Sequence, residues 1–146
     1  MIDLDAYILS LVRIAREEKA EVTATKLQKI FFLLEKEMGT DFGLNFVPYM
    51  FGPYSLKLQE EVNKLLLEGK IKAEDETIHD IISGVEVGVI HKYYTDLNVT
   101  VDERVEEFFR KWVKKSRKEI LNYVYTNYPE YTKYSVIRDK VLKFNE

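Results

Sequence analysis

The sequence predicts one mainly helical α+β domain, and three observations lead to that prediction. Apolar residues recur at spacings of three and four along most of the chain, which is the period of an amphipathic helix. Two stretches, residues 46–51 and 85–94, are rich in the β-branched and aromatic residues of strands. The 146 residues are 46% apolar and 32% charged, so one domain can bury a sufficient core without disulfides. We expect a single domain over residues 1–146, with a core from 1–95 and C-terminal helices, 96–146, packed on it.

Two amphipathic helices are expected at the start of the chain. Asp3 can cap a first helix over residues 4–19, whose apolar side chains form a single stripe. A second helix begins where Thr25 and Gln28 make the pattern of a capping box. The apolar run 30–34 widens the apolar arc of this helix, which therefore predicts burial on more than one side.

An extended segment and a third helix follow. Residues 46–51 are expected to lie at a sheet edge, because the proline among them cannot donate a hydrogen bond to a neighbouring strand. Gly52 and Pro53 are then expected to turn the chain sharply. Ser55 is the next candidate N-cap, and Gly69 is expected to stop the helix that it starts.

A β-hairpin is expected directly after the third helix. Residues 71–73 form a short strand candidate, and valines alternate in the period of a strand over residues 85–94. The acidic residues 74–76 are expected in the loop between the two strands. Because two strands joined by a loop after a helix make a small β-wing, we expect a winged-helix-like helical domain.

The last third of the chain predicts an extra C-terminal helical segment. A capping box that begins at Thr100 predicts a fourth helix. The apolar face changes phase near Ser116, which forms a further capping box with Glu119, so we expect a break there and a fifth helix over about 117–127. A last helical turn or two is expected over residues 135–142.

The chain offers no catalytic or metal-binding constellation. It has no Cys, which excludes thiol chemistry, and its two histidines, His79 and His91, have no metal-ligand spacing. Gly84 and Gly88 favour a hairpin turn over a nucleotide-binding loop, because alternating valines follow the first of them. The longest apolar run has five residues, against about twenty for a membrane span. We expect a cytoplasmic protein that is not an enzyme and binds no cofactor, no metal and no membrane.

Charge is distributed unevenly along the chain. The net charge is −2 over residues 1–54, −7 over 55–109 and +6 over 110–146. The last segment is therefore the candidate for a surface that binds phosphates or an acidic partner, because four lysines there would share an arc if helical. The interpretation that we favour is a solvated helix C-terminus, whose dipole favours cations. The candidate contacts for a partner protein or for nucleic acid are Lys111, Lys114, Lys115 and Lys118, together with Lys57 and Lys64 on the third helix.

Five tyrosines gather close to the C-terminus. They are Tyr123, Tyr125, Tyr128, Tyr131 and Tyr134. Tyrosine suits both a half-buried position and an interface, because it combines an apolar ring with a hydroxyl. We favour packing of this segment onto the domain over a docking surface.

Three ordered motifs support a resemblance to known families. They lie at residues 25–34, 48–55 and 65–71, with further likeness at 122–125 and 128–131. This set resembles the YwgA-like proteins and, more distantly, the Panacea domain of SocA-type antitoxins. The resemblance implies a small non-catalytic domain that neutralises a toxin or adapts a partner. The matching positions are Lys26, Gln28, Lys29, Tyr49, Gly52, Pro53, Tyr54 and Ser55.

These motif positions also have a structural explanation that needs no ligand. Gly52 supplies a permissive backbone conformation, Pro53 fixes the next φ angle and Ser55 caps the third helix. The outward face of that helix is charge-balanced and has no arginine, which makes it a poor reader of DNA bases. We therefore expect a protein that binds another protein, with a DNA-binding transcriptional regulator as the alternative.

Overall fold

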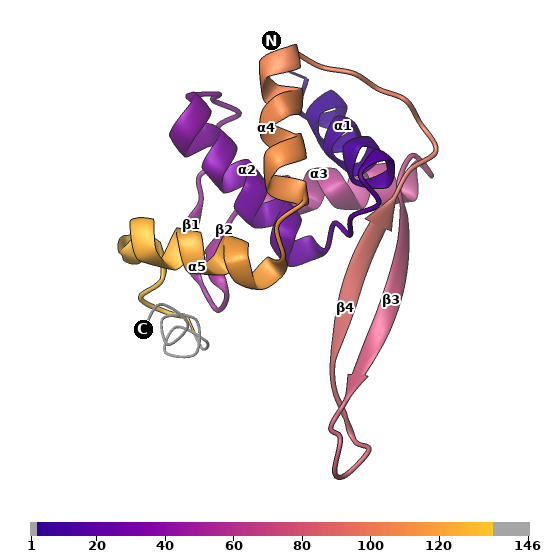
Figure 1. The fold of residues 1–146 in the computed structure, drawn as a ribbon, viewed down its shortest axis with the longest axis vertical. Coiled ribbons are helices and arrows are strands. Elements are labelled where there is room, and N and C mark those ends of the chain that lie inside the picture. Colours follow the sequence, from indigo (N-terminus) through magenta and orange to yellow (C-terminus); the bar gives the residue numbers. More distant parts are fainter. Residues whose placement is uncertain (1–2, 136–146) are drawn as a thin grey trace.

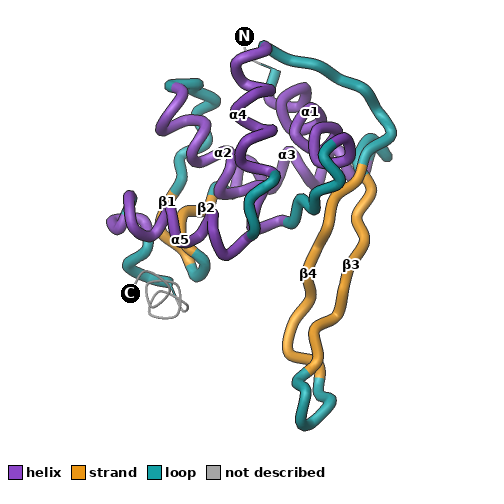
Figure 2. Tube along the Cα trace, in the orientation of Figure 1, coloured by secondary structure: helices purple, strands orange, loops and turns teal. Residues whose placement is uncertain are grey.

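The computed structural model describes residues 3–135, which form five α-helices and two small antiparallel sheets (Figures 1 and 2). The helices are α1 (Leu4–Glu17), α2 (Ala24–Met38), α3 (Leu56–Leu67), α4 (Glu103–Val113) and α5 (Arg117–Asn127), followed by the short 3₁₀ helix η1 (Pro129–Tyr131). The strands are β1 (Val47–Tyr49), β2 (Gly52–Tyr54), β3 (Lys72–His79) and β4 (Glu86–Tyr94). The α+β prediction is confirmed. The helical turn expected over 135–142 falls, apart from Ser135, outside the described residues.

Helix α2 lies at the centre of the core. All five residues of the apolar run 30–34 are fully buried. The helix packs against α4, α5 and β2, while α1 packs against α3 and α4 (Figure 1). The predicted burial of the second helix on more than one side is therefore confirmed, because an apolar arc this wide needs neighbours on several sides.

A partly buried ion pair joins α1 to α4 at the edge of this core. The Arg13 guanidinium lies 2.5 Å from Glu106 Oε2, which also accepts hydrogen bonds from the Ser10 hydroxyl and the Val101 N–H. Burial by itself would raise the pKa of Glu106, but these hydrogen bonds outweigh it and hold that pKa below its usual value. The carboxylate is thus fixed in its charged form.

Three of the five predicted N-caps are confirmed and two are wrong. Asp3, Ser55 and Ser116 cap α1, α3 and α5, and Ser116 forms the predicted capping box. The capping box predicted at Thr25 is wrong, because Thr23 accepts the hydrogen bond from the Lys26 N–H and α2 begins at Ala24. Thr23 is held extended by a β-bridge to Lys92, a long-range contact that no local pattern reveals.

The second wrong cap is the one that Thr100 was expected to provide. The Asp102 carboxylate caps α4 instead, and it accepts hydrogen bonds from the Arg104 and Val105 N–H groups. Asp is a stronger N-cap than Thr, and it lies two residues closer to the first turn. The fifth helix, over 117–127, starts and ends where the sequence predicted.

The extended segment around Pro48 is half of a hairpin. β1 pairs with β2 with Tyr49 opposite Gly52, so Met50 and Phe51 form the turn. The prediction that Gly52 and Pro53 make the turn is therefore wrong, because both belong to β2. Pro48 and Pro53 face each other in this short ladder.

A second, longer hairpin projects from the helices (Figure 1). β3 and β4 pair from Lys72 opposite Tyr94 to His79 opposite Glu86, with a register shift near the tip. The expectation of an acidic loop at 74–76 is wrong, since these residues continue β3. Cross-strand pairing outweighs their weak strand propensity.

Candidate functional site

The family motif positions meet where α2, the β1–β2 hairpin and α3 join. The Gln28 side-chain amide donates to the Ser55 carbonyl at 3.0 Å and accepts from the Ser55 N–H at 2.8 Å. The Lys29 ammonium donates to the Pro53 carbonyl at 3.0 Å. The Ser55 hydroxyl donates to the Leu44 carbonyl and accepts from the Leu58 N–H, which caps α3. The two strongest motifs of the sequence are thus two sides of one joint.

Gly52 lets the hairpin approach α5 closely. Its φ angle is +92°, and a Cβ atom built on it would lie 3.0 Å from the Tyr125 ring and 3.5 Å from Lys29 Cε. A side chain at this position would clash and would also strain the backbone. The structural explanation of this motif position is therefore supported by its surroundings.

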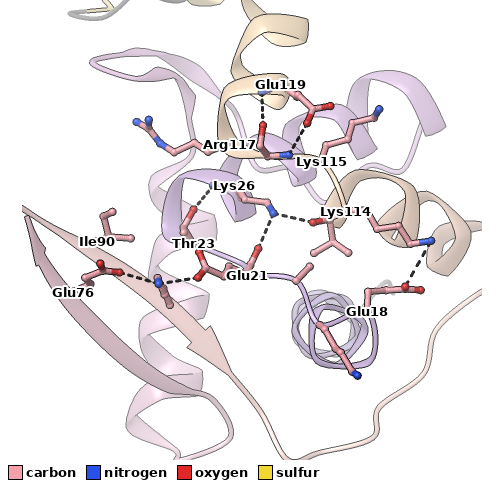
Figure 3. Close-up of a pocket in the computed structure, with 15 residues that line it drawn as sticks. Glu18, Glu21, Thr23, Lys26, Glu76, Ile90, Lys114, Lys115, Arg117 and Glu119 are labelled. Carbon is pink, nitrogen blue, oxygen red and sulfur yellow. Dashed lines mark hydrogen bonds and ion pairs between the residues drawn. The ribbon is translucent and has the colours of Figure 1, made fainter.

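Lys26 lies apart from the other motif residues. Its ammonium donates to the Glu21 carbonyl at 2.7 Å and to the Val113 carbonyl at 2.8 Å, at the C-terminal end of α4 (Figure 3). Burial lowers the pKa of Lys26. Lys26 thus connects the segment between α1 and α2 to the end of α4. The sequence alone did not predict this role.

A small pocket, which we call the hairpin pocket, lies between α2 and the β1–β2 hairpin. It measures about 240 Å³, and Thr25, Lys29, Tyr49, Phe51 and Tyr54 are among its lining residues. Lys29 is almost fully buried at 2% exposure, and burial together with the charge of Arg117 lowers its pKa to about 7. One lining residue of the pocket therefore carries a buried amine whose pKa is lowered to about 7.

The four C-terminal candidate lysines do not share one helix face. Because the helix breaks at Ser116, Lys111 lies on α4, Lys118 on α5, and Lys114 and Lys115 between them. Lys114 pairs with Glu18 at 3.6 Å, and the ammonium groups of Lys111 and Lys115 lie 5.2 and 5.7 Å from the centre of the Trp112 ring. These lysines gather around one turn instead of forming a stripe.

The pocket beside this turn has mixed charge (Figure 3). Lys92 pairs with Glu21 and with Glu76, each at 2.9 Å, while Lys114 pairs with Glu18. Of the six cationic side chains that line this cavity of about 580 Å³ in the described part of the chain, Lys92 and Lys114 are paired with carboxylates, and four glutamates line the cavity as well. It is a poor pocket for a phosphate.

The two candidate lysines of α3 also have partners. Lys64 pairs with Asp5 at 3.2 Å, and Lys57 donates to the Phe42 carbonyl at 3.1 Å. The pocket that both line also contains Asp3, Asp5, Asp41 and Glu61. An acidic neighbourhood of this kind opposes the approach of a nucleic-acid backbone.

The tip of the β3–β4 hairpin is an exposed apolar surface that the sequence analysis missed. Ile81 and Ile82 are 99% and 97% exposed, and Ile78 and Val85 beside them are also exposed. The available signal was the pair of adjacent isoleucines in a segment that was otherwise expected as a turn. Large apolar side chains at the end of a projecting arm are typical of an interaction site.

Most of the C-terminal tyrosines pack onto the domain. Tyr125 is buried, and the Tyr123 and Tyr128 hydroxyls both donate to Glu37 at 2.6 and 3.0 Å. Tyr131 packs edge-on against Phe32, whereas Tyr134 is exposed. The preference for packing over docking agrees with this arrangement.

The two histidines lie on the β3–β4 hairpin, and in the described residues neither belongs to a group that could hold a metal ion. His91 lies 2.7 Å from Asp75 across the β3–β4 ladder, and His79 contacts the Gly84 carbonyl at the hairpin tip. In residues 3–135, no three side chains of His, Cys, Asp or Glu are placed to hold a metal ion. The helices of the same residues are all too short or too polar to cross a bilayer.

Comparisons with known proteins were made for the whole chain. Neither the models of protein families nor the curated protein sequences give a match. The resemblance to the YwgA-like and Panacea families therefore stays a prediction that rests on the motifs.

Proposed function

We propose that this chain is a non-catalytic, winged-helix-like protein that acts by binding a partner protein, as an antitoxin or an adaptor does. The observation that carries the proposal is the β3–β4 hairpin, which projects from the helices and exposes Ile81 and Ile82 almost completely (Figure 1). Branched apolar side chains at the end of an arm are suited to fill an apolar pocket on another protein. Burial of both would favour the complex by about 3–6 kcal/mol.

The order of the elements supports the winged-helix-like part of the proposal. α3 is followed directly by the long β3–β4 hairpin, as a recognition helix is followed by a wing. The base of the hairpin is held to the links between helices, because the Tyr93 N–H donates to the Val22 carbonyl, between α1 and α2, and the Thr95 hydroxyl to the Lys70 carbonyl, after α3. The arm is therefore anchored at one end and exposed at the other.

The charge of the arm indicates the chemistry of the partner. Residues 72–94 contain five acidic residues and two lysines. A matching partner would have an apolar pocket bordered by basic residues. The same charge repels nucleic acid and anionic lipid, so the arm favours a protein over either of them.

The proposal is tested by removing the two isoleucines. The wild-type chain is used to capture proteins from extracts of the native cells, and the captured proteins are purified. Their dissociation constants are then measured with the wild-type chain and with the I81S/I82S variant. Loss of both side chains is expected to weaken a direct partner by about 100-fold or more. Leu67→Ser is the matched control, because Leu67 is 90% exposed but lies at the end of α3. Equal affinities of the wild-type chain and I81S/I82S would contradict the proposal.

A DNA-binding transcriptional regulator is the second candidate. It is favoured by Lys111 and Lys115, which have no ion pair within residues 3–135 and lie close to each other at the α4–α5 turn. The test measures binding to mixed-sequence duplex DNA by fluorescence anisotropy across a salt series. The wild-type chain is compared with a variant in which Glu replaces Lys111, Lys114, Lys115 and Lys118. Binding that falls with salt and vanishes in the folded variant would support this candidate. No binding at low salt would leave partner-protein binding as the proposed function.

A further inference from the structure

The hairpin pocket differs in charge from other pockets of this protein. None of its lining residues is acidic, and Lys29 is one of them. Four other pockets in the described part of the chain each contain at least one carboxylate. The described lining of the hairpin pocket thus presents no like charge to an anion.

The positive charge beside this pocket has no counter-ion in the described part of the chain. Lys29 donates to the Pro53 carbonyl, and neither Lys29 nor Arg117 forms an ion pair with a carboxylate among residues 3–135. The Arg117 guanidinium lies 5.9 Å from the centre of the Phe51 ring, which lines the pocket. A buried amine that lacks an anionic partner is costly to keep charged. An anion that reached Lys29 would remove that cost.

The remainder of the lining is apolar or carries hydroxyl groups. Tyr49, Met50 and Phe51 form the tip of the β1–β2 hairpin and are between 39% and 49% exposed, so they have apolar surface left to bury. Thr25 and Tyr54 add hydroxyl groups. The volume of about 240 Å³ is below the range of roughly 300–1,000 Å³ that is typical of drug-sized ligands. The ligand would therefore be a small group and not a nucleotide.

We propose that the hairpin pocket binds a small organic carboxylate, whose carboxylate accepts a hydrogen bond from Lys29 and whose apolar part packs on the tip of the β1–β2 hairpin. The site is separate from the β3–β4 arm, and the proposal does not depend on partner binding by that arm. A free organic acid and the C-terminal carboxylate of a peptide offer the same chemistry. The experiment below distinguishes these two sources.

Proton uptake should accompany binding at this site. In the described residues, the titratable groups beside Lys29 or its pocket are Arg117, Tyr125, Tyr49 and Tyr54, and none of these is a carboxylate. A bound carboxylate favours the ammonium form of Lys29. If only that form binds, the pKa of about 7 makes the dissociation constant rise about fivefold from pH 7 to 8 and about 50-fold from pH 7 to 9.

The test is a titration of the full chain, in which NMR follows the Lys29 side chain through ¹³C-labelled lysine. The probes are 3-phenylpropionate and N-acetylphenylalanine, each compared with its uncharged amide. The acids are expected to bind with dissociation constants of about 5 mM or lower, at least tenfold below those of the amides. Saturation with acid should raise the pKa of Lys29 by at least one unit. Tighter binding of N-acetylphenylalanine indicates a peptide C-terminus, and tighter binding of 3-phenylpropionate indicates a free acid.

Two variants complete the test. Lys29→Met keeps most of the apolar stem and should lose at least tenfold in affinity for the acids but not for the amides. Lys36→Met removes the same charge from the exposed end of α2, outside the pocket, and should bind like the wild-type chain. Equal binding of acid and amide, no acid binding, or an unchanged pKa of Lys29 at saturation would each overturn the proposal. The last measurement needs only the wild-type chain, so it decides even if Lys29→Met does not fold.

Discussion

Replacement of Gln28 by leucine tests the joint between α2 and α3. Gln28 is 2% exposed, and its amide holds both backbone groups of Ser55. In Gln28→Leu the Ser55 carbonyl keeps a partner, because it also accepts from the Gln59 N–H at 3.2 Å. The buried Ser55 N–H loses the Gln28 oxygen, and a buried donor without an acceptor costs about 1–3 kcal/mol in addition to the lost hydrogen bonds. We expect the free energy of unfolding to fall by about 2–4 kcal/mol.

Urea unfolding followed by circular dichroism measures this loss. A chain of this size has an m-value of about 1–3 kcal/mol/M, so the midpoint should fall by about 0.7–4 M with an unchanged m-value. Asn63→Leu is the matched control, because Asn63 is exposed on α3 and only accepts a hydrogen bond from the Gln59 amide at 3.1 Å, and it should cost about 0.5 kcal/mol or less. A loss below about 1 kcal/mol for Gln28→Leu, or equal losses in the two variants, would refute the role assigned to the Gln28 amide.

Three further changes have outcomes that thermal or urea unfolding can check. Gly52→Ala should cost about 1–3 kcal/mol, because the φ angle is +92° and the new Cβ would lie 3.0 Å from the Tyr125 ring; an unchanged melting temperature would contradict this. Glu106→Gln should make the free energy of unfolding less dependent on pH in acid. The lowered pKa of Glu106 in the folded state contributes stability above the ordinary value of 4.5, and this contribution is lost as the pH falls through the folded pKa. The variant should therefore lose less stability than the wild-type chain between pH 6 and pH 3, and equal losses would show that the ion pair with Arg13 does not titrate with folding. Ser116→Ala removes half of a capping box and should cost about 0.5–2 kcal/mol, and no loss would show that α5 is held by packing alone.

The helices were predictable because their signals are local. The apolar run 30–34 predicts a buried helix wherever the rest of the chain goes, and the capping box at Ser116 is complete within four residues. The errors arose where a distant contact decided the outcome. Thr23 caps α2 because a bridge to Lys92 holds it extended, and no pattern within a few residues of Thr25 contains that information.

The strands were predicted less well than the helices. The acidic residues 74–76 have low strand propensity, yet they continue β3 because β4 offers them partners in register. In the short hairpin, Met50 and Phe51 were expected within a strand and form the turn instead. Register is a property of two strands, so the pattern of one segment cannot fix it.

In the candidate site, too, the sequence predicted the residues but not their contacts. The sequence singled out two motifs. The first contains Lys26, Gln28 and Lys29, and the second lies at residues 48–55. The sequence did not predict that Gln28 and Lys29 hold the second motif while Lys26 bonds to the end of α4. The candidate surface lysines were chosen by charge and by expected helical position, and two of them, Lys64 and Lys114, are paired with carboxylates in the fold.

The amino-acid sequence by itself determined the helical character of this protein, the breaks between its helices and the uneven distribution of charge. These depend on periodicity, caps and composition, which act over a few residues. Only the tertiary structure decided that Lys29 is buried beside a pocket without a carboxylate, and that Ile81 and Ile82 stand exposed at the end of an arm. Burial and pairing depend on segments far apart in the chain, because a side chain's surroundings are set by whatever packs against it.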